Sequence, residues 1–280
     1  MLTSNESPSL LAIWKRLPYV VAWNWLNLLT FNLANQRTDD SIAEDRLNKS
    51  WRPIASGLIS QAEARRWLLA LIPAGLGISL LMGAATETLL MLVMTWMYND
   101  IGGGSDNFIT RNGLNGLAFA LHNYGSTKIA ANDPALGYGH GDANTETVLN
   151  RTAGSWLVII GCIVFTTLQV QDLPDMAGDG ERGRKTIPLV FGEWPCRVSI
   201  AVNVVLWSLV GILFWRLQHN SPVPCTLLLA VGAAVALRVL LFRNVSSDER
   251  TYKLWCLWLA LVYSLPFVYS LVNSPMNFLS

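Results

Sequence analysis

Charged residues are scarce in this chain, at 14% of its 280 residues. A soluble domain typically has about 25% charged residues, so the composition argues against a soluble globular protein. Hydrophobic residues make up 52% of the sequence, and 12 residues are tryptophan. The formal net charge of +1 gives no sign of the basic surface that binds nucleic acid, and we expect no nucleic-acid partner. The composition instead indicates an integral membrane protein.

Cysteine is also sparse. No pair has the spacing of a zinc site or of a disulfide framework, so we expect ordinary buried thiols. The N-terminal segment, residues 1–20, lacks the basic region, apolar core and cleavage site of a signal peptide, and we expect no cleaved leader. The four cysteines are Cys162, Cys196, Cys225 and Cys256.

Apolar runs of helical length recur about eight times, whereas a transmembrane helix needs about 20 apolar residues. No long polar segment separates these runs. The sequence therefore predicts an all-α, multi-pass membrane protein of about eight transmembrane helices, folded as a single domain over residues 1–280. The third run is short and could be tilted or half-buried. The expected spans are Leu17–Leu33, Ala64–Gly83, Glu87–Tyr98, Asn115–Ala131, Ala153–Gln171, Val198–Trp215, Val223–Leu241 and Leu254–Val272.

Most of the lysine and arginine residues fall on one side of the expected membrane topology. Alternating the helices places the loops 34–63, 99–114, 172–197 and 242–253 on that side. The positive-inside rule makes it the cytoplasmic side. Acidic residues gather on the same loops, and orientation in the membrane does not explain why they do so.

Three carboxylates follow the fifth apolar run. Asp172, Asp175 and Asp179 are spaced i, i+3, i+7 and would share one face of a helix. Carboxylate oxygens bind hard cations such as Mg²⁺, and arginine and lysine suit phosphate. Residues 172–188 therefore indicate a metal-bound diphosphate at the edge of a bilayer. The basic residues that follow the carboxylates are Arg182, Arg184 and Lys185.

A second acidic segment lies in the first polar loop. Gln36, Asp40 and Glu44 would form one stripe of a helix, and Asn35 and Asp39 a neighbouring stripe. Taken alone, this segment could be a solvated loop of mixed charge. A second acidic stripe expected on the same side favours a site in which two or three Mg²⁺ ions bridge one diphosphate.

Both segments resemble the two motifs of the UbiA superfamily of intramembrane prenyltransferases. The stretch Asp45-Arg-Leu-Asn-Lys-Ser-Trp-Arg-Pro-Ile-Ala-Ser-Gly57, within the loop 35–57, is similar to the family's first motif. Residues 172–188 are similar to its second motif, Asp-x-x-Asp-x-x-Gly-Asp with a Ser/Thr-x-Pro tail. The resemblance implies a helical bundle around a central cavity, Mg²⁺ as cofactor and contact with membrane lipid. It also implies an isoprenoid diphosphate as substrate, farnesyl or geranylgeranyl, and the endoplasmic reticulum if the source is eukaryotic.

The register of the first motif stays open. The family spaces its ligands at 0, +4 and +8. Counting from Asn35 ends on Ala43, whereas counting from Gln36 gives Asp40 and Glu44. We prefer Asp40 and Glu44, because they share a face. One span precedes this motif where the family typically has two, so we expect a reduced bundle or a truncated first helix.

Anchoring the first motif on Arg52 instead favours Asp45, which could alternatively hold the basic loop. The resemblance thus implies a catalytic set of Asp40, Glu44, Asp172 and Asp175. Its candidate metal ligands are Asp39, Asp40, Glu44, Asp45, Asp172, Asp175 and Asp179. Its candidate diphosphate-binding residues are Asn35, Lys49, Arg52, Asn99, Arg184 and Lys185.

The segment Asn99-Asp100-Ile-Gly-Gly103 looks more like the fungal branch that includes terpene cyclases than like aromatic-accepting members. It could add a ligand, or it could be a glycine-rich turn with a helix cap. We therefore expect cyclisation of the ionised isoprenoid to a sesquiterpene or diterpene. The alternative is prenyl transfer to an aromatic or quinone-precursor acceptor. A transporter or scaffold would need neither acidic motif, and the sequence leaves the oligomeric state open.

Overall fold

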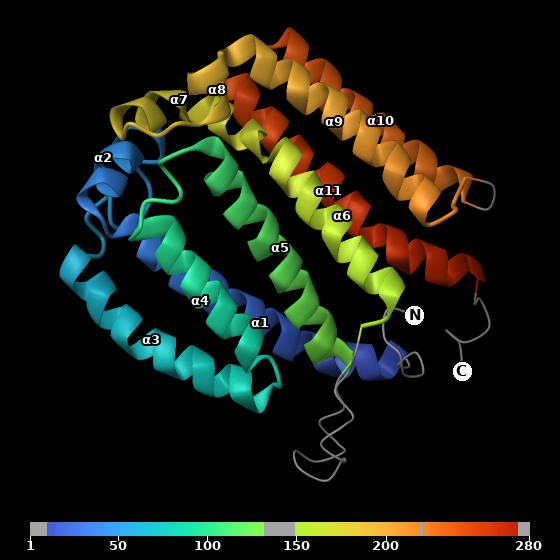
Figure 1. Ribbon diagram of the computed structural model, residues 1–280, viewed down its shortest axis with the longest axis horizontal. Coiled ribbons are helices and arrows are strands. Elements are labelled where there is room, and N and C mark those ends of the chain that lie inside the picture. The colour runs from blue at the N-terminus through green and yellow to red at the C-terminus, as the bar shows by residue number, and fades with distance from the viewer. Residues whose placement is uncertain (1–9, 132–148, 219–220, 274–280) are drawn as a thin grey trace. The chain divides into compact units, whose positions relative to one another are not determined.

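The computed structural model describes residues 10–131, 149–218 and 221–273. Most of these residues lie in helices (Figure 1), so the predicted all-α class is confirmed. The chain divides into two compact units, Met1–Cys162 and Ile163–Ser280. A single domain over residues 1–280 stays a prediction. Residues 1–9, part of the segment expected not to be a cleaved leader, lie outside the described residues.

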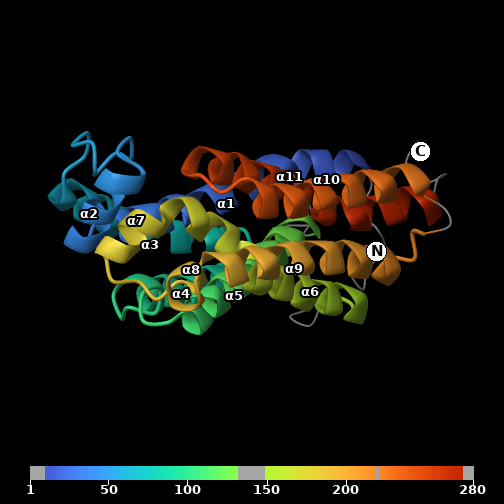
Figure 2. The same ribbon diagram turned by 90° about the horizontal axis from the view of Figure 1, so that it is seen from above.

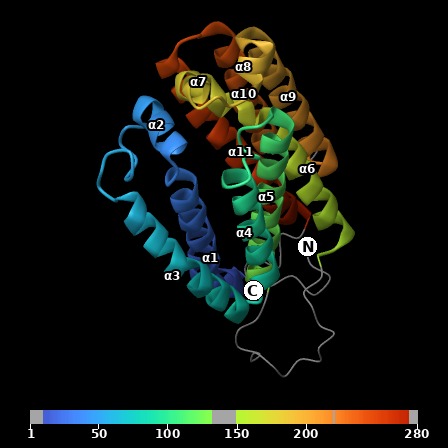
Figure 3. The same cartoon turned by 60° about the vertical axis from the view of Figure 1, so that its left-hand side comes forward.

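In the N-terminal unit, the long first helix packs against three later helices. α1 contacts α3, α4 and α5, and α3 and α5 each contact α4. The short α2 lies at the C-terminal end of α1 (Figure 3). α6 begins in this unit and crosses its boundary. The bounds are α1 (Leu10–Gln36), α2 (Asp39–Asn48), α3 (Gln61–Leu81), α4 (Ala85–Asn99), α5 (Phe108–Ala131) and α6 (Arg151–Thr167).

Trp23 of α1 lies at the centre of the N-terminal unit and is fully buried. Its indole N–H donates to Thr88 Oγ1 at 3.0 Å, and Thr88 Oγ1 donates to Ser79 Oγ at 2.7 Å. The indole thus keeps its polar atom satisfied inside an apolar core. Gly125 of α5 lets the ring approach, because a Cβ at this position would lie 2.3 Å from the indole. The buried cluster around the ring also contains Ala84, Met91 and Ile129.

In the C-terminal unit, three long helices pack together and two short ones lie at their end. α10 contacts α9 and α11, while α7 and the 3₁₀ helix η2 contact α11 (Figure 2). α8 contacts both α7 and α9. The bounds are η2 (Leu168–Gln171), α7 (Asp172–Glu181), α8 (Ile187–Phe191), α9 (Glu193–Phe214), α10 (Pro222–Leu241) and α11 (Val245–Asn273).

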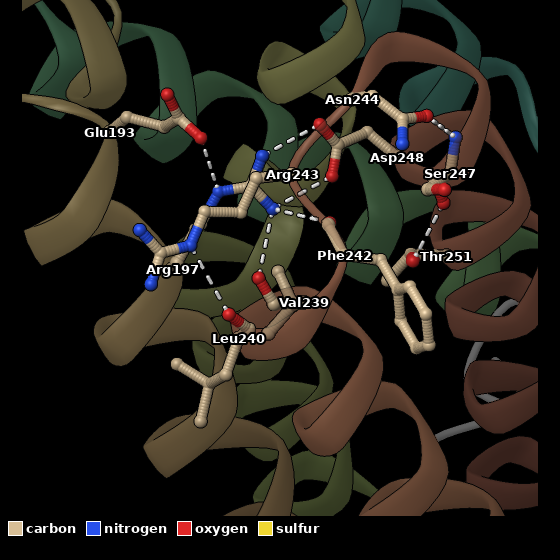
Figure 4. A network of polar contacts seen from close by, with 10 residues as sticks. All are labelled: Glu193, Arg197, Val239, Leu240, Phe242, Arg243, Asn244, Ser247, Asp248 and Thr251. Carbon is tan, nitrogen blue, oxygen red and sulfur yellow. Dashed lines mark hydrogen bonds and ion pairs between the residues drawn. The ribbon is translucent and has the colours of Figure 1, made fainter.

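Arg197 of α9 ties these three long helices together (Figure 4). Its guanidinium donates to both carboxylate oxygens of Asp248, on the first turn of α11, at 2.8 and 2.7 Å. It also donates to Glu193 Oε1 at 2.7 Å and to the Val239 carbonyl of α10 at 2.8 Å. Arg197 is only 2% exposed. Removing one partner of such a buried pair typically costs about 3–5 kcal/mol, so the network fixes how α9, α10 and α11 meet.

Five of the eight expected apolar runs lie within one helix; Ala64–Gly83 and Val198–Trp215 extend past the ends of α3 and α9, and Ala153–Gln171 covers α6 and η2. Five helical segments among the described residues are long and apolar enough to cross a membrane. The count of eight spans stays a prediction, because α1, α4 and α5 are not among the five. Large apolar side chains cover the outer faces of the five, including Leu69 and Val223, at 77% and 76% exposed. Acyl chains suit such surfaces and water does not. The five segments are Gln61–Leu81, Arg151–Glu181, Glu193–Phe214, Pro222–Leu241 and Val245–Asn273.

We predict that Gly125→Ala destabilises the protein by about 1–3 kcal/mol, because the added methyl group overpacks the site against Trp23. Gly113→Ala on the same helix is the control, since no atom lies within 4 Å of a Cβ there. That variant should be neutral or stabilising by about 0.5–1 kcal/mol. Thermal unfolding of the purified protein in detergent measures both. Equal stability of the two variants would contradict the packing assigned to Trp23.

Candidate active site

The second acidic segment forms the helix that its spacing predicts. Asp172, Asp175 and Asp179 all lie in α7, so the i, i+3, i+7 face is confirmed as helical. Asp172 is 1% exposed, Asp179 is 0% exposed, and Asp175 between them is half-buried. η2 leads directly into α7, which places Asp172 at the end of the apolar α6–η2 run. The carboxylates therefore lie where an apolar segment ends.

The basic tail after α7 folds back onto it. Gly183 adopts a positive φ of 71°, a conformation that favours glycine, and turns the chain. Arg184 is 7% exposed and donates from Nη1 to Asp179 Oδ1 at 3.2 Å, while its backbone N–H donates to the Asp179 carbonyl. Lys185 is exposed. Of the two predicted diphosphate ligands here, Arg184 is thus held against the acidic helix and Lys185 faces outward.

Thr186 is a residue that the sequence reasoning missed. It is 0% exposed, and its hydroxyl has no hydrogen-bond partner in the structure. A buried hydroxyl without a partner costs about 1–3 kcal/mol unless something else satisfies it. A signal was present, because the second family motif carries a serine or threonine at this place in its tail.

The first acidic segment does not form the single helix expected of it. α1 ends at Gln36 and α2 begins at Asp39, so the expected stripe of Gln36, Asp40 and Glu44 on one helix is wrong. Thr38 lies between the two helices with an extended backbone, φ −83° and ψ 151°, at the N-cap position of α2. Two carboxylates in the first turn of α2 favour this new start, because the N-terminus of a helix carries partial positive charge.

Within α2, the candidate ligands differ in burial. Glu44 is 5% exposed, whereas Asp39 and Asp40 are exposed. Asp39 Oδ1 accepts a hydrogen bond from Gln61 Nε2 of α3 at 2.7 Å. Asp40 and Glu44 remain four residues apart in one helix and hence on one face, as the preferred register requires. Lys49, at the C-cap of α2, is half-buried.

Asp45 is paired with the basic loop. It is 2% exposed and accepts from Arg52 Nη1 at 2.8 and 3.1 Å. Burial raises the pKa of Asp45, and the positive charge of Arg52 opposes this shift. The contact matches the alternative in which Asp45 holds the basic loop. Its partner Arg52 is also one of the residues predicted to bind diphosphate.

Two asparagines at the adjoining ends of α1 and α4 keep an unpaired amide oxygen. Asn35 Oδ1 and Asn99 Oδ1 are both buried without a hydrogen-bond partner. The amide of Asn99 donates to the Thr95 carbonyl at 2.9 Å, which fixes its orientation. An ion pair between Arg37 and Asp100 links the ends of α1 and α4. Amide oxygens that lack a donor suit a cation or an ordered water.

The glycine-rich segment after Asn99 forms the turn that the simpler alternative expects. Its glycines let the chain pass close to Tyr98, because a Cβ at Gly104 would lie 2.5 Å from that ring. Asn107 then caps α5 by accepting from the Thr110 backbone N–H at 2.8 Å. The sequence reasoning also missed the buried Arg111, which is 4% exposed and donates to the hydroxyl of Tyr98.

The donor set fits Mg²⁺ better than it fits a softer metal. In the parts of the chain that the structure describes, no three His, Cys, Asp or Glu side chains converge on one point. Mg²⁺ usually takes only one or two carboxylates and completes its shell with water and phosphate oxygens. In the N-terminal unit, Glu44 and the unpaired oxygens of Asn35 and Asn99 are hard ligands of this kind. In the C-terminal unit, Asp172 and Asp179 are.

Helices apolar enough to span a membrane, with acidic and basic residues collected near the ends of several, are typical of a helical membrane protein. A model of the UbiA prenyltransferase family matches residues 3–265. Because this match covers most of its length, the chain belongs to the UbiA prenyltransferase family and is an integral membrane enzyme.

Relatives in this family include both cyclases and a transferase. The chain is 30% identical to the somaliensene A/B synthase of Streptomyces somaliensis, over 88% of this chain and 78% of the relative. It is also 30% identical to the diterpene cyclase eriG of Hericium erinaceus, over 86% and 74% of the two chains. The polyprenyl transferase eriF of Hericium erinaceus is 26% identical, over 84% and 74%.

The fold also matches a solved structure of the family. A UbiA homologue from Archaeoglobus fulgidus, solved bound to GPP and Mg²⁺, aligns with a TM-score of 0.55 and 15% identity. The alignment covers 91% of this chain and 95% of the homologue. The likeness confirms the UbiA-like fold.

We predict that Asp45 and Arg52 stabilise the protein as a pair. In a double-mutant cycle of Asp45→Asn and Arg52→Gln, the coupling free energy should be about 0.5–3 kcal/mol, because each residue satisfies the other. Unfolding in detergent measures all four variants. Pairing Arg52→Gln with Asp106→Asn, on the α4–α5 turn, is the control and should be additive within about 0.5 kcal/mol. Additivity in the first cycle would show that Asp45 does not hold this loop.

Proposed function

We propose that this protein is a terpene cyclase that ionises an isoprenoid diphosphate within the membrane. The observation that carries the proposal is α7, which follows the apolar α6–η2 run. In it Asp172 and Asp179 are buried, and Asp179 is paired with Arg184. Buried carboxylates and a buried guanidinium at one helix bind metal and phosphate together. The family match and the diterpene cyclase and synthase relatives support the same chemistry.

The family resemblance extends the proposal to the first acidic segment, which would also bind metal. Glu44 and Asp40 of α2 would hold metal, and Asn35 and Asn99 would offer their unpaired amide oxygens to a metal or to its water shell. Asp45 would act by holding Arg52 in place rather than as a ligand. When bound, Mg²⁺ supplies the positive charge that stabilises the departing diphosphate.

Basic residues would complete the binding of the leaving group. Arg184 is already oriented by Asp179, and Lys185 and Lys49 would neutralise the remaining charge. Charge that the protein fixes in advance stabilises the transition state without further reorganisation. The resulting allylic cation would be shielded from water by apolar side chains of the helices. Farnesyl and geranylgeranyl diphosphate are the proposed substrates, and the endoplasmic reticulum is the proposed membrane if the source is eukaryotic.

Cyclisation is preferred over transfer because two cyclase-type relatives are 30% identical to the chain and the transferase is 26% identical. The segment Asn99-Asp100-Ile-Gly-Gly103 is the second ground, because it resembles the family branch that includes terpene cyclases. Transfer to an aromatic or quinone-precursor acceptor is the second candidate, and the eriF relative supports it. The metal and diphosphate chemistry is common to both.

We predict that the purified protein with Mg²⁺ releases diphosphate from farnesyl or geranylgeranyl diphosphate in the absence of any acceptor, and forms a cyclic hydrocarbon. Geranyl diphosphate is tested in parallel. Diphosphate release and gas chromatography of the extract measure the two products, and EDTA should abolish both because the metal stabilises the leaving group. Diphosphate release that requires an aromatic acceptor would establish the transferase instead.

In the same assay, we predict that Asp175→Ala lowers diphosphate release by about 100-fold or more, because it removes charge stabilisation from the leaving-group site. Glu181→Gln is the matched control. Glu181 is exposed and lies on the opposite side of α7 from the acidic face, so its loss should leave activity unchanged. Circular dichroism checks that both variants are helical. Full activity of Asp175→Ala would remove α7 from the proposed site.

A further inference from the structure

His122 is a half-buried base in the second half of α5 that the proposed metal and diphosphate chemistry does not use. Its Nδ1 lies 3.0 Å from the Ala118 carbonyl oxygen. A carbonyl oxygen can only accept, so Nδ1 carries the proton and Nε2 keeps its lone pair. Nε2 is buried and has no hydrogen-bond partner in the structure. The hydrogen bond at one nitrogen therefore leaves the other as an oriented acceptor.

An unpaired acceptor at this position is costly. A buried polar atom without a partner destabilises the fold, because it has lost its hydrogen bond to water and gained none in return. The ring is also fixed, since it lies edge-on to the buried Trp23 with centroids 5.9 Å apart. Neighbouring polar groups on the helix are satisfied, because Ser126 accepts from Asn24 at 2.7 Å. The unused lone pair of His122 is thus an unsatisfied acceptor that a reaction partner would explain.

The depth of His122 suits the far end of an isoprenoid chain. The polar end of this unit contains Asn35, Asn99 and Arg111, near the start of α5. His122 lies about three turns further along the helix, or about 16 Å from Arg111. A diphosphate bound at the polar end would lie too far away to take a proton from a cation that has migrated along the chain. A base at the position of His122 would lie close enough to such a cation to take its proton.

We propose that His122 Nε2 accepts the proton that ends cyclisation. The C–H bond beside the cationic carbon breaks, and its electron pair becomes the second bond of a carbon–carbon double bond. The proton goes to Nε2, whose lone pair forms the new N–H bond and turns imidazole into imidazolium. Water or the released diphosphate takes the proton away between turnovers. This proposal rests on the cyclase function, since prenyl transfer forms its bond beside the diphosphate.

The variant His122→Asn tests the proposal with little change in structure. Asn115 and Asn123 on the same helix each donate from Nδ2 to the carbonyl four residues earlier, at 2.9 and 2.7 Å. An asparagine at 122 can make the same bond to Ala118 but has no basic nitrogen. We expect diphosphate release to persist, because ionisation precedes proton loss. The main alkene should fall about 100-fold relative to the diphosphate released, replaced by isomeric alkenes or by alcohols from water capture.

Asn123→Ala is the matched control, since it removes a polar group of the next residue without touching the base, and its product profile should match the wild type. His122→Gln is the second variant if His122→Asn does not fold by circular dichroism. An unchanged product profile at unchanged diphosphate release would overturn the proposal, because another group then takes the proton. A parallel fall of release and of all products would also overturn it, since it indicates a structural role. Absence of acceptor-free release by the wild type would instead overturn the cyclase function itself.

Discussion

Burial of carboxylates at the ends of apolar helices is the constraint on which the site depends. Asp45, Asp172 and Asp179 are each 2% exposed or less, and each would lose several kcal/mol of solvation without a compensating positive charge. Arg52 and Arg184 provide part of that charge through direct ion pairs. Divalent metal and its diphosphate would provide the rest, so the fold and the chemistry would share one electrostatic requirement.

The cost of burying a polar group also applies to the side chains inside the helical units. Several polar side chains in the interior have a specific hydrogen-bond partner, as Trp23 has in Thr88 and Trp258 has in Ser208. Arg197 with its carboxylate Asp248 shows the rule for full charges, at the ends of α9 and α11. His122 departs from this pattern, with one nitrogen bonded and the other unpaired, as do the amide oxygens of Asn35 and Asn99 and the hydroxyl of Thr186. A departure of this kind from a locally consistent fold is typical of a functional residue.

Much of the fold could be predicted because apolar runs and an i, i+3, i+7 acidic spacing are local signals. α7 carries Asp172, Asp175 and Asp179 as that spacing predicts. The first motif failed because tertiary contacts decide its helix break. Arg37 turns away to pair with Asp100, and the helix stops at Gln36 despite a favourable periodicity. Propensity and pattern are weak where such distant contacts compete. The unpaired Nε2 of His122 likewise depends on packing that no spacing encodes.

The central claim is that metal and diphosphate bind this protein together through its buried carboxylates. A thio analogue of farnesyl diphosphate that cannot ionise tests it directly, by thermal unfolding of the purified protein in detergent. Mg²⁺ and the analogue together should raise the unfolding midpoint by more than the sum of their separate shifts, because each increases the affinity for the other. Asp172→Asn should abolish the excess. An analogue shift that is the same with Mg²⁺ and with EDTA would contradict the account.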